Sequence, residues 1–411
     1  MTAPATPAGA APGASLWAFA VLSASYFAFI GYFNPYLPLW LKDLGFSTLA
    51  IGALGSVQGI TRVVAPYSWG WLSDRTGHRV WLMRIASGAA LLCALGLLLT
   101  PRWVAPSLPY VGAVLFAMFA NTSAMMPMAE AAVAQRVSTG RGLDLRRYGR
   151  VRVWGSIGFI VTVVVFGFWF ERHGIRPFAL GAVLLLLVLA CACWALPGAP
   201  DSAHGREPAP SLKPVLAQPA VRWFFVSAFL MLLAHVALYG FFSLHLDALG
   251  YDKRVLGMLW AVSVLAEIAW FLLQGRWGAD WTPPTWIAVA CAAAALRFAL
   301  TAALGASPAA LVVAQLLHAL TFAAHHSACI AFINHHFTGR LRGRGQALYT
   351  VLGYGCSGVL GGVAGGALSE AAGFAAVFWA GSASALLASA AALRSRTAAA
   401  QASGENPERP V

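Results

Sequence analysis

Apolar residues fill long stretches of this chain, and short polar stretches separate them. Each stretch holds roughly 20 mostly apolar residues, the length that a helix needs to cross a bilayer. We therefore predict twelve membrane-spanning helices. The first six lie near 16–40, 48–72, 80–100, 108–134, 152–170 and 177–196. After a polar, proline-rich stretch, six more lie near 221–244, 254–275, 283–304, 309–333, 343–368 and 373–393.

The composition agrees with a membrane protein. Of the 411 residues, 59% are hydrophobic and only 10% are charged. A soluble domain carries roughly 25% charged residues, because its surface faces water. The six cysteines lie inside apolar segments, which is typical of small buried residues and not of a disulfide framework or a zinc motif.

The basic residues are distributed unevenly between the two faces of the membrane. If the N-terminus is cytoplasmic, that face holds 19 of the 27 lysines and arginines, the opposite face holds six, and Arg62 and Arg297 fall within spans. This bias follows the positive-inside rule. It predicts a multi-pass protein of the cell inner (plasma) membrane with both termini in the cytoplasm. It also explains the net charge of +13 without a nucleic-acid partner.

The spans and the polar stretches between them predict five segments. These are a flexible cytoplasmic tail at 1–15, a six-helix bundle at 16–196, a cytoplasmic linker at 197–220, a second six-helix bundle at 221–393 and a cytoplasmic tail at 394–411.

The two sets of six spans carry matching loops. Trp-x-x-Asp occurs after the second span, at Trp71 and Asp74, and again after the eighth, at Trp277 and Asp280, 206 residues later. These matches indicate an internal duplication. The predicted fold is an all-α membrane protein of two pseudo-symmetric six-helix bundles, with a substrate site near the membrane midplane between bundles that rock around it.

Several motifs resemble those of a known family. The loop at 70–79 resembles the Gly-x-x-x-Asp-Arg-x-Gly-x-Arg signature of the major facilitator superfamily, although the copy after the eighth span lacks the later Gly and Arg. Residues 148–159 resemble the 3-phenylpropionate permease branch, which is related to the lactose permease and other sugar/proton symporters. Further matches are His235, Tyr239-Gly240, Ala266-Glu267, Arg297, His318 and Thr321-Phe322.

The resemblance runs from about Tyr26 to Leu393 and implies a secondary transporter that works by alternating access. It also implies a cytoplasmic gate. We assign this gate to Asp74, Arg75, Arg79, Arg150 and Asp280.

Ionisable residues inside the spans are the candidates for a functional site. A charge at the bilayer centre costs about 2.5–3.5 kcal/mol on insertion scales, so such residues are kept for a reason. The candidates are Arg62, Glu130, Glu267, Arg297, His235, His318, His325 and His326. On the tenth span, seven residues separate His318 from His325, which places both on one helix face.

A proton carrier needs a carboxyl group whose charge state changes with its surroundings. Burial favours a neutral carboxyl group, and an approaching arginine favours the charged form. The resemblance implies that Glu267, Arg297, His318 and His326 couple transport to protons. The alternative is a static polar core that links helices. A metal site at His325-His326 or His335-His336 is less favoured, because adjacent helical residues point about 100° apart.

Fixed positive charge predicts an anionic substrate. Arg62 and Arg297 remain protonated in proteins, and an arginine binds a carboxylate with two parallel hydrogen bonds. We predict that the substrate contacts Asn34, Arg62, Glu130, His235, Tyr239, Trp260 and Gln315. An aromatic carboxylate such as 3-phenylpropionate fits this set. A sugar or nucleoside taken up by proton symport also fits, and export of a drug or metabolite is a third reading.

Other function classes lack their sequence signatures. The chain has no His-Glu-x-x-His, no nucleophile elbow and no phosphate-binding Gly-x-x-x-x-Gly-Lys-[Ser/Thr]. We therefore expect neither an enzyme nor ATP hydrolysis, and no cofactor or bound metal. The expected partners are a small-molecule substrate, protons and the lipid bilayer, and a monomer is the default for this fold.

Overall fold

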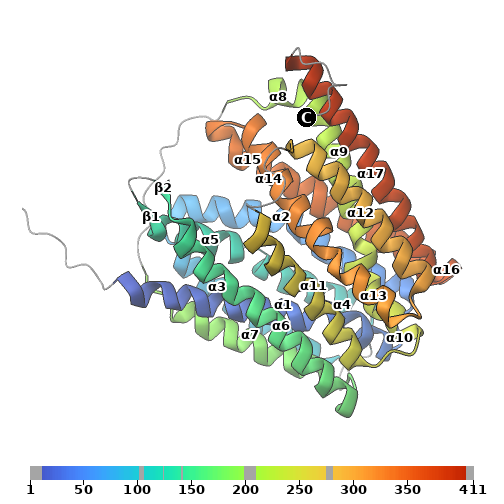
Figure 1. Ribbon diagram of the computed structural model, residues 1–411. Helices are drawn as coiled ribbons and strands as arrows, with labels where there is room; N and C mark the ends of the chain where they lie inside the picture. The colour runs from blue at the N-terminus through green and yellow to red at the C-terminus, as the bar shows by residue number, and fades with distance from the viewer. Residues whose placement is uncertain are drawn as a thin grey trace, which may run out of the picture.

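A computed structural model describes residues 12–100, 106–123, 125–139, 142–198, 210–274 and 281–403. Within these residues, eleven helices are long and apolar enough to cross a membrane, and the shorter apolar helix Phe178–Trp194 occupies the sixth expected span. The chain folds into two packed groups of helices (Figure 1). The prediction of an all-α membrane protein with twelve spans is confirmed.

The helices before the linker form what we call the first bundle. Its elements are α1 (Pro12–Asp43), α2 (Thr48–Thr76), α3 (Arg79–Leu99), α4 (Leu108–Thr122), α5 (Met125–Val137), β1 (Ser138–Thr139), β2 (Gly142–Leu143), α6 (Leu145–His173) and α7 (Phe178–Trp194). The fourth span consists of α4 and α5. The antiparallel pair β1–β2, two residues a strand, was not predicted.

The short helix α8 (Lys213–Ala217) lies in the expected linker, and the helices after it form the second bundle. Its elements are α9 (Pro219–Val236), η1 (Ala237–Phe241), α10 (Phe242–Ala248), α11 (Lys253–Leu273), α12 (Pro283–Leu304), α13 (Pro308–Leu316), η3 (Ala319–Ala324), α14 (His325–His336), η4 (Gly339–Leu341), α15 (Arg342–Tyr349), η5 (Thr350–Cys356), α16 (Ser357–Ala372) and α17 (Phe374–Ser403).

Capping residues set several helix ends. The side chains of Ser47 and Asp252 accept hydrogen bonds from backbone N–H groups in the first turns of α2 and α11. Gly77, the second glycine of the 70–79 signature, adopts a left-handed conformation with φ of 67° and ends α2. Glycine adopts this conformation without the steric cost that a side chain would add. The tight turn to α3 therefore requires the signature glycine.

Three spans of the second bundle change helical type near their middle. The π-helical segments η1, η3 and η5 interrupt the seventh, tenth and eleventh spans, and the described part of the first bundle has none. A π-helical turn contains one extra residue relative to an α-helical turn, and such turns occur frequently at functional sites.

The two bundles converge at one end of the molecule. In the first bundle α1 packs on α6 and α7, and in the second α17 packs on α9 and α12. Between the bundles, α2 packs on α16, α6 on α11 and α1 on α10 (Figure 1). Lys42 at the end of α1 forms a 2.7 Å ion pair with Asp247 of α10, and Glu171 of α6 accepts a 2.8 Å hydrogen bond from the Lys253 N–H. These ties lie at the ends of α1, α6 and α10, opposite the end where α1 begins.

Glycines allow the closest approach between the bundles. A Cβ atom added to Gly52 of α2 would collide with the carbonyl oxygen of Gly362 on α16, and one added to Gly257 of α11 would collide with that of Val163 on α6. Ser56 also donates a 3.0 Å hydrogen bond to the Val359 carbonyl oxygen across the same interface. The backbones therefore touch without intervening side chains.

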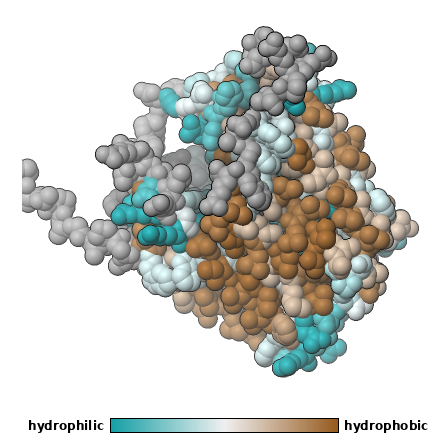
Figure 2. All heavy atoms as spheres, viewed as in Figure 1, coloured by the Kyte–Doolittle hydropathy of each residue, from teal (hydrophilic) through white to brown (hydrophobic). Residues whose placement is uncertain are grey.

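The outer surface carries a broad apolar band. Figure 2 shows hydrophobic residues covering the middle of the visible face, with hydrophilic residues gathered toward the ends of the helices. Large apolar side chains such as Leu92 and Leu272 are 69% and 78% exposed. This pattern suits contact with lipid around the middle and with water at both ends.

Two helices extend past the expected segments, and a short helix forms inside the expected linker. Helix α1 begins at Pro12, inside the expected tail, and α8 forms inside the expected linker. Helix α17 continues to Ser403, ten residues past the expected boundary at 393. Its extension packs on α9, where the Ser395 hydroxyl donates to the Ala220 carbonyl oxygen at 2.8 Å. Alanine-rich sequence has high helix propensity, so the helix runs beyond its apolar stretch.

Candidate functional site

Arg297 of α12 is the centre of a buried polar cluster. Its side chain is 1% exposed and donates hydrogen bonds from Nη1 to His318 Nδ1 at 2.8 Å and to Thr321 Oγ1 at 3.0 Å. Its Nη2 donates to Gln315 Oε1 at 2.8 Å. A buried guanidinium is costly unless it is hydrogen-bonded, and here three neutral side chains on the tenth span satisfy it.

The contact with Arg297 fixes the tautomer of His318. A guanidinium only donates, so His318 Nδ1 accepts and the ring proton resides on Nε2. His318 Nε2 lies 4.0 Å from Glu267 Oε2 of α11. The Glu267 side chain is 15% exposed. One chain of contacts thus links Arg297 through His318 to the largely buried Glu267 carboxyl group.

An aromatic wall lies beside this cluster. The rings of Tyr239 and Trp260 stack with centroids 6.1 Å apart, and Phe159 of α6 lies 6.3 Å from Trp260. His235 Nδ1 donates to the Met231 carbonyl oxygen at 2.9 Å, so its Nε2 is a bare acceptor. Neither His235 Nε2 nor Trp260 Nε1 has a hydrogen-bond partner within the described residues. His235 Nε2 is therefore an unused hydrogen-bond acceptor beside the wall, and Trp260 Nε1 is an unused donor within it.

A column of rings extends along the tenth span. Phe322 stacks between His318 and His326, with centroid distances of 5.1 and 6.2 Å and nearly parallel planes. The residues are spaced by four, which places them on one helix face. His326 contacts Tyr349 at 6.2 Å, and Tyr349 contacts Tyr354 at 5.7 Å. The column connects Arg297 and its partners to the eleventh span.

Arg62 joins the column from the first bundle. Its guanidinium lies 5.6 Å from the centre of the Tyr354 ring. Arg297 and Glu267 are joined through His318, whereas Glu130 lines a pocket of the first bundle with Arg152. That the four charged residues form one site stays a prediction.

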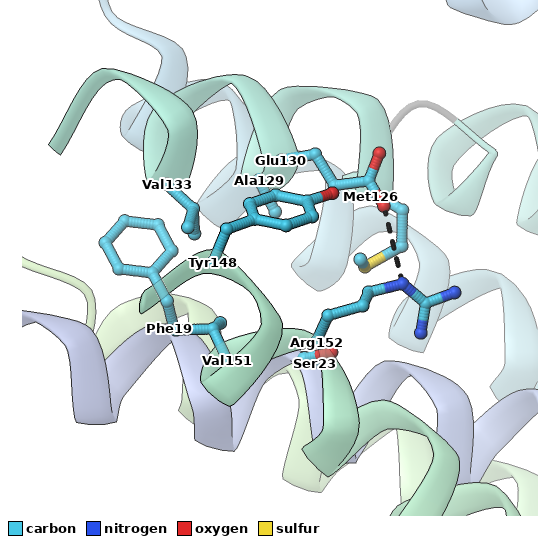
Figure 3. A pocket seen from close by; sticks show the side chains of 9 residues that line it. All are labelled: Phe19, Ser23, Met126, Ala129, Glu130, Val133, Tyr148, Val151 and Arg152. Atoms are coloured by element: carbon cyan, nitrogen blue, oxygen red, sulfur yellow. Dashed lines mark ion pairs between the residues drawn. The ribbon is translucent and has the colours of Figure 1, made fainter. Parts of the chain in front are cut away.

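A pocket in the first bundle contains Glu130. Arg152 of α6 lies opposite, with Nε 3.8 Å from Glu130 Oε1, and the two side chains are 38% and 43% exposed. Figure 3 shows the Glu130 carboxyl group directed toward the Arg152 guanidinium and the Tyr148 ring beside it. The pocket is shallow and partly open to solvent. Its lining residues are Phe19, Ser23, Met126, Ala129, Glu130, Val133, Tyr148, Val151 and Arg152.

Arg152 is the residue that sequence reasoning missed. The charge count placed it in a cytoplasmic loop, whereas it lies in the span Arg147–His173 and faces Glu130. Its guanidinium also lies over the Phe27 ring at 4.3 Å. The spacing of Tyr148 and Arg152, four residues apart on a helix, was the available signal that both share one face.

The predicted substrate contacts Asn34 and Gln315 and the further candidate His325 are placed as follows. Gln58 Nε2 donates to Asn34 Oδ1 at 3.4 Å, which ties α1 to α2. Gln315 is buried, with its amide oxygen occupied by Arg297. His325, also buried, has its Nε2 3.6 Å from Cys329 Sγ and lies off the ring column.

The expected gate is only partly described. Arg75 lies over the Trp71 ring at 5.2 Å, and Arg150 is exposed at the start of α6. Arg79 begins α3. The side chain of Asp74 and the whole of Asp280 lie outside the described residues. The gate stays a prediction.

Comparison with known proteins identifies the family. The model of the MFS_1 like family matches residues 16–380. The chain belongs to the MFS_1 like family. Over 322 residues it is 27% identical to the "Probable 3-phenylpropionic acid transporter" of Escherichia coli (strain K12). The match covers 75% of this chain and 79% of that protein. This agrees with the branch that the 148–159 motif indicated.

Two further transporters are similar to this chain in sequence or in fold. The chain is 27% identical over 258 residues to the maltose permease of Geobacillus stearothermophilus, covering 62% of this chain and 63% of that protein. The crystal structure of a mutant nucleoside transporter NupG superposes with a TM-score of 0.81 at 17% identity, covering 92% of this chain and 99% of that one. This MFS_1 like protein is thus a multi-pass membrane transporter of small molecules and not an enzyme.

Proposed function

We propose that the protein is a proton symporter that takes up a small aromatic carboxylate, such as 3-phenylpropionate, by alternating access. The observation that carries the proposal is the contact chain from Arg297 through His318 to Glu267. The three side chains that accept hydrogen bonds from Arg297 are neutral, so Arg297 forms no ion pair with Glu267, and the Glu267 carboxyl group is available to bind and release a proton.

The proposal assigns a role to each part of the site. Glu267 carries the proton, His318 donates its Nε2–H toward the carboxyl group, and Arg297 holds His318 in that tautomer. His326 extends the proton-coupling set toward the first bundle. Seven residues line or support the substrate path: Asn34, Arg62, Glu130, His235, Tyr239, Trp260 and Gln315.

The setting of the transporter in the cell is part of the same proposal. The excess of basic residues on the face that carries the termini supports cytoplasmic termini in an inner membrane. With this orientation, the ties at Lys42–Asp247 and Glu171–Lys253 lie at the outer face of the membrane. We propose a monomer driven by the proton gradient and not by ATP.

A neutral sugar or nucleoside is the second candidate substrate. The accessible Glu130 carboxyl group is suited to accept hydroxyl hydrogen bonds, and the fold similarity to a nucleoside transporter and the sequence similarity to a maltose permease fit this reading. A thermal-shift screen of the purified protein separates the two. Stabilisation by 3-phenylpropionate but not by maltose or uridine supports the carboxylate, and the reverse result supports the neutral solute.

Glu267→Gln tests proton coupling directly. Glutamine keeps the size of the side chain and removes its titration, so we expect proteoliposomes carrying this variant to lose accumulation driven by a pH gradient while retaining part of the exchange of labelled solute across the membrane. Glu370→Gln, at an exposed position of α16, is the matched control and should behave as wild type. Normal gradient-driven accumulation by Glu267→Gln would remove Glu267 from the mechanism.

A further inference from the structure

His235 carries a buried hydrogen-bond acceptor that no group in the described part of the chain uses. The residue is 1% exposed, and its Nδ1 donates to the Met231 carbonyl oxygen on its own helix. Nε2, on the other side of the ring, has no partner within the described residues. Buried polar groups in proteins are nearly always hydrogen-bonded, so an unpaired one in a candidate site points to a ligand.

Trp260 carries the complementary group, a buried donor. An indole N–H can only donate, and it usually finds a partner when it is buried. Trp260 is 4% exposed, and its Nε1 has no acceptor in the part of the chain that the structure describes. Its ring is held by Tyr239, at a centroid distance of 6.1 Å, and by Phe242, edge-on at 6.0 Å.

Tyr239 contacts both residues and joins them into one aromatic cluster. Its ring centroid lies 6.1 Å from that of His235 and 6.1 Å from that of Trp260. The π-helical segment η1 follows His235 closely and contains Tyr239. Turns of this type occur frequently at functional sites. The two unpaired atoms therefore belong to neighbouring spans that meet at one aromatic surface.

This cluster adjoins the buried arginine on one side and the first bundle on the other. The His235 ring lies edge-on to Phe298 at 5.3 Å, and the Arg297 guanidinium lies 5.8 Å from the centre of the Phe298 ring. Phe159 of the first bundle lies 6.3 Å from Trp260. The unpaired atoms are thus close to the interface at which the two bundles move in the proposed transport cycle.

We propose that His235 Nε2 and Trp260 Nε1 recognise a hydroxyl group on the aromatic ring of the substrate, so that the protein prefers ring-hydroxylated aromatic carboxylates. This inference rests on the proposed symport of an aromatic carboxylate and names the substrate class within it. A phenolic hydroxyl donates to the imidazole nitrogen, and its oxygen accepts from the indole N–H. Each bond by itself favours the hydroxylated ring, because a ring without the hydroxyl leaves the buried group unpaired.

The test varies the ring substituent and keeps the carboxylate constant. The purified full-length protein is titrated with 3-phenylpropionates that carry a hydroxyl or a methyl group, which are similar in size, at each of the three ring positions. We expect the best hydroxy acid to have a Kd about tenfold lower than the methyl acid of the same position. Equal Kd values for hydroxy and methyl acids at all three positions would overturn the proposal.

A second pair of ligands isolates the indole donor. A methoxy group accepts a hydrogen bond and cannot donate one, and an ethyl group of similar size does neither. At the preferred ring position, the methoxy acid should bind more tightly than the ethyl acid to wild type, and equally tightly to Trp260→Phe. Trp379→Phe, at a half-exposed position of α17, is the matched control and should keep the wild-type difference. An unchanged difference in Trp260→Phe would remove Trp260 from recognition.

Variants of His235 separate recognition from folding. His235→Phe keeps a ring and removes the acceptor, so the preference for hydroxy over methyl acid should shrink. His235→Gln, whose amide oxygen reaches about as far as Nε2, should restore part of this preference. A purely structural role would lower the thermal unfolding midpoint of His235→Phe and leave the ratio of the two Kd values unchanged, which would overturn the role of His235.

Uptake into vesicles distinguishes the two levels of failure. If wild type binds the unsubstituted acid and accumulates it under a pH gradient but shows no preference for a hydroxyl group, only this inference falls. If wild type binds none of the acids and accumulates none of them, the proposed function is wrong as well.

Discussion

Arg297 has hydrogen-bond partners on three side chains, and none of them is a carboxylate. His318 separates it from the carboxyl group of Glu267, which lies 4.0 Å from His318 Nε2. While Arg297 donates to His318 Nδ1, that nitrogen cannot carry a proton. We therefore propose that His318 is a neutral donor that positions the proton carrier, and that Glu267 is the group that changes charge.

Arg297→Lys should destabilise the protein as well as impair transport. An ammonium group cannot reproduce the planar fork that serves His318, Thr321 and Gln315, so at least one buried acceptor loses its partner. Each unpaired buried group costs about 1–3 kcal/mol. We expect a clearly lower thermal unfolding midpoint in detergent, against an unchanged midpoint for Arg172→Lys. Equal midpoints for the two variants would contradict the buried geometry.

At the residue scale, the sequence showed which charged residues lie inside the spans, but not which side chains they contact. Arg62, Glu130, Glu267 and Arg297 were recognisable because charges inside apolar spans are costly. Arg152 was not, because it lies near the start of a span, where an arginine looks like part of a basic loop. Pairing partners such as Gln315 for Arg297 depend on helix packing, which local sequence patterns do not specify.

At the scale of elements, glycine sets the distance between the bundles. Gly52 and Gly257 stand where α2 meets α16 and α6 meets α11, and no side chain fits at either place. The sequence shows seven glycines in the eleventh span between Gly353 and Gly366. It does not show which helix of the other bundle they contact, since the contact joins segments some 300 residues apart, as in Ser56 and Val359.

Gly257→Val should push the bundles apart at the end that Lys42 and Asp247 hold together. The added side chain collides with the Val163 backbone, so the closed interface becomes unfavourable. The measurement is cross-linking of Lys42→Cys with Asp247→Cys by a short bifunctional thiol reagent. We expect a lower yield with Gly257→Val than with Gly55→Val, where nothing lies within 4 Å of the added Cβ. Equal yields would show that this contact does not hold the interface closed.

The π-helical segments were beyond sequence prediction. A single extra residue in a turn leaves the apolar pattern of a membrane span almost unchanged, because nearly all its positions are apolar. The segments place or flank Tyr239, His318 and Tyr354, which belong to the candidate site.

At the scale of the whole molecule, the twelve spans followed from hydropathy alone. The bilayer requires each span to be long, apolar and internally hydrogen-bonded, so sequence constrains these helices strongly. Segment ends were less well constrained, as α17 shows by continuing to Ser403. The convergence of the bundles at one end depends on interactions such as Lys42–Asp247, which become visible only in three dimensions.

Proton movement driven by the solute alone tests the central claim most directly. Proteoliposomes with a pH-sensitive dye inside receive 3-phenylpropionate outside, with no initial pH gradient and with protein-free liposomes as the baseline for diffusion of the free acid. We predict acidification above this baseline for wild type and none for Glu267→Gln. Entry of labelled solute through wild type without excess acidification, or equal acidification by Glu267→Gln, would contradict proton symport through this site.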